Sequence, residues 1–142
     1  MLYATRSPKA SFSMSRPEAE RARALLGRSD ADLAAVSALE TAERVPDEIV
    51  GFHGQQAAEK LLKAVLAAHG IDFPRTHSLR FLLDLLADHT LEPPRDLHAV
   101  ADLYPFGVQF RYEAPLYEGH LDRAAVRELL DRLRDWAARH IP

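Results

Sequence analysis

The chain has 142 residues and a mass of 15.9 kDa, which is the size of one domain. Hydrophobic residues make up 47% and charged residues 27%, with a formal net charge of −3, and this globular composition excludes a disordered chain, a fibrous chain and a non-specific nucleic-acid coat. Cysteine is absent, which excludes a disulfide scaffold, thiolate metal sites and a cysteine nucleophile and agrees with a cytoplasmic location.

Residues 1–14 are expected to form a disordered leader, because they are rich in serine, proline and arginine and lack the apolar centre of a secretory signal. A single helical domain is then expected over residues 15–142. No apolar run approaches the roughly 18–20 residues that cross a bilayer, so no membrane association is expected.

The first helix is expected to begin at Ser15 or Arg16, because Pro17 and two acidic residues suit the first turn of a helix. Apolar residues at helical spacing then continue to about Ala42. Gly27 lies inside this run and costs about 1 kcal/mol against alanine, so a kink there is the alternative to one long helix.

The second helix is expected from Asp47 to His69, where a broad apolar stripe follows a proline. Gly70 suits the position just after the helix, because glycine tolerates a positive φ angle.

Thr76 or Ser78 is expected to cap a third helix that carries a leucine stripe as far as Leu86. The fourth segment is expected to be a kinked helix over 95–111, since a proline and a glycine interrupt its apolar pattern.

The last helix is expected to be capped by Asp122 and to run to Ala137, with its apolar residues on one face. Five helices joined by short connections predict an all-α protein, an up-and-down five-helix bundle with a four-helix core and a C-terminal helix.

The densest group of polar residues lies on the second predicted helix. Residues three and four apart share a helical face, which gives one polar line of Gln56, Lys60 and Lys63 and another of Gln55, Glu59 and Lys63. Glu59 and Lys63 have the order and spacing of an ion pair. The group is either a solvated ridge beside the core or the lining of a polar interface or an anion pocket.

The run FHGQQAAEKLLKAVLAAHGIDFPRTHSL, positions 52–79, resembles the signature of the HEPN domains, the higher eukaryotes and prokaryotes nucleotide-binding family. Two other stretches also resemble patterns of this family, namely residues 29–35 and residues 103–104 followed by 110–112. The resemblance covers the chain from about Pro17 onward. It implies a five-helix bundle, a homodimer and a minimal nucleotidyltransferase partner, with this chain as one half of a toxin–antitoxin type pair that takes a nucleotide or RNA.

Many members of that family are metal-independent ribonucleases in which an arginine is followed, after roughly four to six residues, by a histidine suited to proton transfer. The matching arginine here is Arg111, beside Tyr112, and no histidine falls in that window because His120 lies too far along the chain. The resemblance therefore implies a degenerate ribonuclease motif in a binding and interaction module, with Arg111 and Tyr112 as candidate phosphate contacts. The alternative is a weak metal-independent ribonuclease that uses Arg111 at a dimer interface, with Tyr112, Tyr117 or His120 as the proton donor.

His77 follows Thr76 at the start of the third predicted helix, where it either joins an anion site or fixes the loop through a structural hydrogen bond. Asp32 is expected to be a paired structural carboxylate. No cofactor and no metal are expected, since glycine-rich phosphate loops and paired Glu-x-x-His patterns are missing from the sequence. The candidate residues for nucleotide or interface binding are Gln56, Glu59, Lys60, Lys63, His77 and Arg111.

Overall fold

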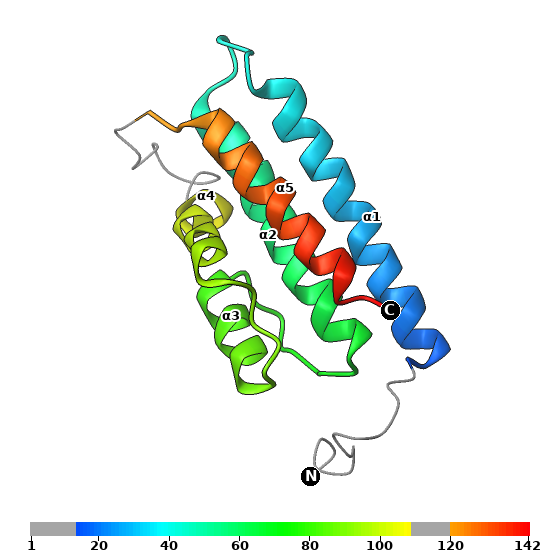
Figure 1. Ribbon diagram of the computed structural model, residues 1–142. Helices are drawn as coiled ribbons and strands as arrows, with labels where there is room; N and C mark the ends of the chain where they lie inside the picture. Colours follow the sequence, from blue (N-terminus) through cyan, green and yellow to red (C-terminus); the bar gives the residue numbers. More distant parts are fainter. Residues whose placement is uncertain (1–13, 109–119) are drawn as a thin grey trace.

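The computed structural model of the protein describes residues 14–108 and 120–142 (Figure 1). Within these two ranges the chain forms five α-helices and one 3-10 helix and contains no strand, which confirms the expected all-helical bundle. The elements are α1 (Arg16–Leu39), α2 (Asp47–Ala68), α3 (Leu79–Asp88), η2 (Arg95–Leu103), α4 (Tyr104–Val108) and α5 (Arg123–Arg139).

Side-chain caps start three of the helices. Ser15 caps α1 in a capping box, in which its hydroxyl accepts from the backbone N–H of Glu18 and its own N–H donates to the Glu18 carboxylate. Ser78, rather than Thr76, caps α3, and Asp122 caps α5 as predicted. These caps satisfy backbone donors that the first turn of a helix leaves open, so the sequence itself determines where these helices begin.

Helix α2 is the centre of the bundle and packs against α1, α3, η2, α4 and α5. Figure 1 shows α1, α2 and α5 running side by side, with α3 and α4 beside α2. Most of the residues of α2 are buried, and nearly all of these are small or apolar, as expected of a helix in the centre of a core. The largest fully buried apolar side chains are Leu61, Leu62, Leu66, Leu79, Leu82, Leu83, Leu86, Leu130 and Leu133.

The first helix is continuous through Gly27, which confirms one long helix without a break. Gly70 has a φ of 69° after α2, as predicted. Met14 is partly buried and packs against the small cluster around Ala22 and Ala68. None of the helices in the described parts of the chain is both long and apolar enough to cross a membrane.

The fourth segment differs from its prediction, because residues 95–103 form a 3-10 helix and only the short α4 follows it as an α-helix. The proline explains part of this difference. Pro105 has no N–H to donate to the carbonyl of Ala101, and the N–H of Tyr104 bonds that carbonyl instead, in the tighter i to i+3 pattern. The remainder of the predicted segment, 109–111, lies outside the described residues.

Arg123, at the start of α5, holds the connection between α1 and α2. Its guanidinium donates to the carbonyl oxygens of Leu39 (2.8 Å), Ala42 (3.0 Å) and Val45, and its Nε donates to the Asp47 carboxylate at 2.9 Å. One side chain therefore satisfies carbonyls at the end of α1 and a carboxylate at the start of α2.

Candidate functional site

The polar residues predicted on the second helix lie on α2, and two of them are buried. Gln55 is 0% exposed and Glu59 is 5% exposed, so the interpretation as a solvated ridge is wrong for these two. Gln56, Lys60 and Lys63 remain partly exposed. Because a buried carboxylate is costly unless it is paired, the contacts of Glu59 determine the character of the site.

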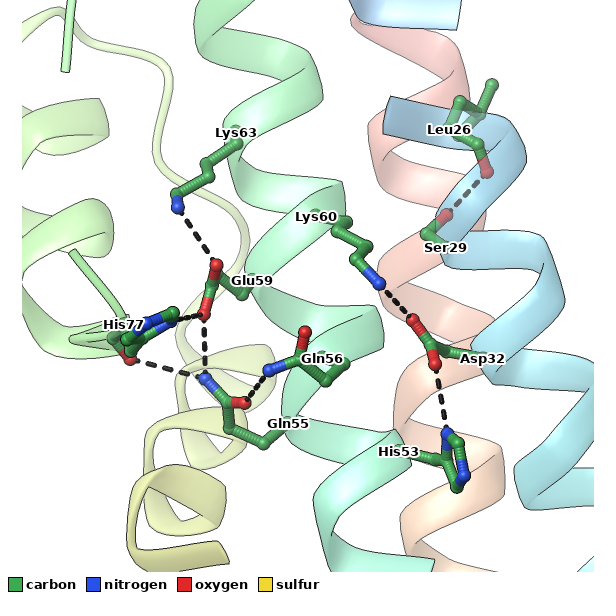
Figure 2. A network of polar contacts seen from close by, with 10 residues as sticks. All are labelled: Leu26, Ser29, Asp32, His53, Gln55, Gln56, Glu59, Lys60, Lys63 and His77. Atoms are coloured by element: carbon green, nitrogen blue, oxygen red, sulfur yellow. Dashed lines mark hydrogen bonds and ion pairs between the residues drawn. The ribbon is translucent and has the colours of Figure 1, made fainter. Parts of the chain in front are cut away.

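The carboxylate of Glu59 is the centre of one hydrogen-bond network (Figure 2). The Lys63 ammonium lies 2.9 Å from Oε2, while His77 Nδ1 and Gln55 Nε2 lie 2.9 and 3.0 Å from Oε1. Gln55 Nε2 also lies 3.2 Å from the carbonyl oxygen of His77. The network confirms the predicted ion pair of Glu59 with Lys63. It also shows that His77 makes a structural hydrogen bond, one of the two alternatives for this residue, and through this bond the loop before α3 is held against α2.

This network sets the protonation of Glu59. Burial raises the pKa of the Glu59 carboxyl, but the hydrogen bonds from Lys63, His77 and Gln55 outweigh burial and hold the pKa below its ordinary value. Glu59 is therefore ionised at neutral pH, and its charge keeps the three donors in place.

The lowered pKa of Glu59 predicts a loss of stability in acid. A carboxyl with a lower pKa in the folded state stabilises the fold above its unfolded pKa, and this contribution disappears as the pH falls through the folded value. We expect Glu59→Gln to unfold at lower urea concentration than the wild type at about pH 7, and the difference to shrink at about pH 4. Urea titrations of both proteins at the two pH values measure it. A difference that is equal at both values would contradict this assignment.

A second, smaller network joins α2 to α1. Asp32 of α1 accepts from Lys60 Nζ at 2.6 Å, and His53 Nδ1 lies 3.0 Å from its other oxygen. This confirms Asp32 as a paired carboxylate. Figure 2 shows Gln56 between the two networks, and Gln56 Nε2 donates to the side-chain oxygen of Gln55 at 2.8 Å. Each network thus contains a lysine, a carboxylate and a histidine, with one on each side of α2.

Helix α4 rests on the Gln55 side chain. A Cβ atom added to Gly107 would lie 2.3 Å from Gln55 Cδ and 2.4 Å from its Oε1, so the close approach requires glycine. Gln55 is held by its own hydrogen bonds, so the polar network also fixes the position of α4 on α2.

The candidates Arg111 and Tyr112, like Tyr117, lie outside the described residues. His120, the other candidate proton donor, is exposed just before α5. Within 14–108 and 120–142, no group of three or more His, Asp or Glu side chains is placed to hold a metal ion.

Two residues that make side-chain contacts between helices, His53 and Arg123, were not singled out as candidates from the sequence. His53 lies three residues before Gln56 and seven before Lys60, so its helical phase carried a signal for the exposed face of α2. Arg123 carried no such signal, because it is 76 residues away from its partner Asp47 along the chain.

This fold and site define a small helical bundle whose central, largely apolar helix carries a row of polar side chains. The family model for the HEPN domain matches residues 22–138, and the chain belongs to that family. The crystal structure of an archaeal HEPN homologue is similar over 85% of this chain and 98% of its own, with a TM-score of 0.64 and 24% identity. At that identity the likeness supports the fold. No curated protein matches the chain.

Proposed function

We propose that this HEPN protein is a binding and interaction module that pairs with a minimal nucleotidyltransferase, as one half of a toxin–antitoxin type pair, and associates with a nucleotide or RNA. The observation that carries the proposal is that the polar residues of the two networks on α2 are all paired, while the ribonuclease motif lacks its histidine. The polar residues of α2 form two complete networks, whereas no histidine follows Arg111 at the spacing that the ribonuclease members of the family use.

The nucleotidyltransferase partner can be tested directly. We expect the full chain, immobilised at micromolar concentration, to retain the minimal nucleotidyltransferase encoded beside it. An unrelated helical bundle of similar charge serves as the control. Retention of nothing above that control would overturn the proposal of this partner.

We also propose that the chain is a homodimer, since members of the family commonly dimerise. Light scattering at tens of micromolar should give about twice the mass of one chain, 15.9 kDa. A mass of one chain over that concentration range would refute the dimer.

The degenerate motif predicts that the isolated protein does not cleave RNA. Without a histidine near Arg111, no side chain in that window is suited to take and return a proton at neutral pH. Incubation with labelled RNA, without added metal, is expected to leave the RNA intact in both the wild type and Arg111→Ala. Cleavage that is lost in Arg111→Ala would support the ribonuclease alternative instead.

A further inference from the structure

Helices α1 and α2 share a row of basic side chains along their junction. Toward one end, Lys60 of α2 is paired with Asp32 of α1 at 2.6 Å. Toward the other end, the Arg21 guanidinium of α1 and the Lys63 ammonium of α2 lie over the ring of Phe73, 4.6 and 5.6 Å from its centroid. The ion pair of Lys60 with Asp32 thus holds one end of the row, and the contacts of Arg21 and Lys63 with the Phe73 ring hold the other end.

Arg28 lies on α1 between these two ends. Positions 21, 25, 28 and 32 are spaced by four, three and four residues, so they share one face of the helix. Leu25, on the same face, packs against the cluster that contains Ala67 of α2. Arg28 is exposed, and among the described residues no hydrogen bond or ion pair engages its guanidinium. We call Arg21, Arg28, Lys60 and Lys63 the basic strip.

The basic strip keeps an excess of positive charge on a protein whose net charge is −3. Among the residues that the structure describes, Lys60 pairs with Asp32 and Lys63 pairs with Glu59, whereas Arg21 and Arg28 form no ion pair. An ammonium has three N–H donors, and the carboxylates of Asp32 and Glu59 each engage one lysine, so donors remain on Lys60 and Lys63. A local positive surface on an acidic protein attracts anions specifically to that surface.

The dimensions of the strip suit a ligand with more than one phosphate group. From Arg21 to Arg28 the helix rises about 10 Å, at 1.5 Å per residue. An exposed guanidinium binds a phosphate through two parallel hydrogen bonds, and lysines add point charges beside it.

We propose that the basic strip binds the phosphate groups of a nucleotide or of an RNA strand. This inference rests on the proposed function and names the surface that would carry it. Arg28 makes the bidentate contact, while Lys60 and Lys63 contribute charge from α2. Asp32 and Glu59 do not touch the ligand and act by holding the lysines in position.

The test compares two charge reversals on the same helix. Arg28→Glu changes the strip, and Arg23→Glu makes the same change at an exposed position on another face of α1. A fluorescein-labelled single-stranded oligoribonucleotide and a fluorescent ATP analogue serve as probes, with binding measured by anisotropy. We expect Arg28→Glu to weaken binding by at least about tenfold and Arg23→Glu to change it by less than about twofold. Urea unfolding of both variants confirms that each is folded.

The two probes distinguish the sources of phosphate. Loss of oligoribonucleotide binding alone identifies RNA as the ligand, and loss of nucleotide binding alone identifies a nucleotide. The inference is overturned if the wild type binds neither probe at micromolar concentration, if Arg28→Glu binds as the wild type does, or if Arg23→Glu weakens binding equally. Retention of the nucleotidyltransferase is measured separately, so failure of the strip is distinguishable from failure of the proposed partner.

Discussion

Replacing Arg123 with alanine is expected to lower the free energy of unfolding by about 3 kcal/mol, because it removes one partner of a largely buried, hydrogen-bonded ion pair. The side chain is 14% exposed, and its partner Asp47 is 19% exposed. The carbonyls of Leu39, Ala42 and Val45 would also lose the guanidinium that they share. Urea unfolding followed by circular dichroism measures the loss.

Arg123→Lys separates the geometry of the guanidinium from its charge, and Arg139→Ala serves as the control. Arg123→Lys keeps the charge but lacks the planar fork, so it is expected to lose an intermediate amount of stability. Arg139→Ala removes an exposed arginine from the last turn of the same helix and is expected to change stability by less than about 0.5 kcal/mol. Equal losses in Arg123→Ala and Arg139→Ala would contradict the role of Arg123 in holding the connection.

The helices were predictable because their signals are local. Ser15 with Glu18, Ser78 and Asp122 each determine a helix start through contacts within three residues. The 3-10 form of residues 95–103 was missed, because an apolar pattern at helical spacing does not distinguish the two kinds of helix over nine residues.

The candidate site was predictable only within α2. The pair of Glu59 and Lys63 follows from spacing along one helix, and it is present. The burial of Gln55, however, depends on α4, which packs against it through Gly107. Likewise, the partners of Asp32 lie 21 and 28 residues away on another helix. Such contacts depend on tertiary packing, and no spacing rule encodes them.

Gly27 of α1 and Gly51 of α2 should respond with opposite sign to replacement by alanine. Alanine in place of glycine inside a helix gains about 1 kcal/mol from helix propensity alone. At Gly27 nothing lies within 4 Å of the added Cβ, so Gly27→Ala is expected to stabilise the protein by about that amount. At Gly51 the added Cβ would lie 2.5, 2.6 and 2.8 Å from three atoms of the Phe106 ring.

The clash at Gly51 is expected to outweigh the gain in propensity. Phe106 is 6% exposed, and its ring belongs to the hydrophobic core, so relief requires α4 to move away from α2. Overpacking of this kind costs about 1–3 kcal/mol, so after the gain of about 1 kcal/mol from propensity the net effect of Gly51→Ala is a loss of about 1 kcal/mol. Combining Gly51→Ala with Phe106→Leu should cost less than the sum of the two single changes, because the smaller side chain relieves the clash. Stabilisation by Gly51→Ala, or strict additivity in the double variant, would mean that α4 does not approach α2 as closely as these contacts require.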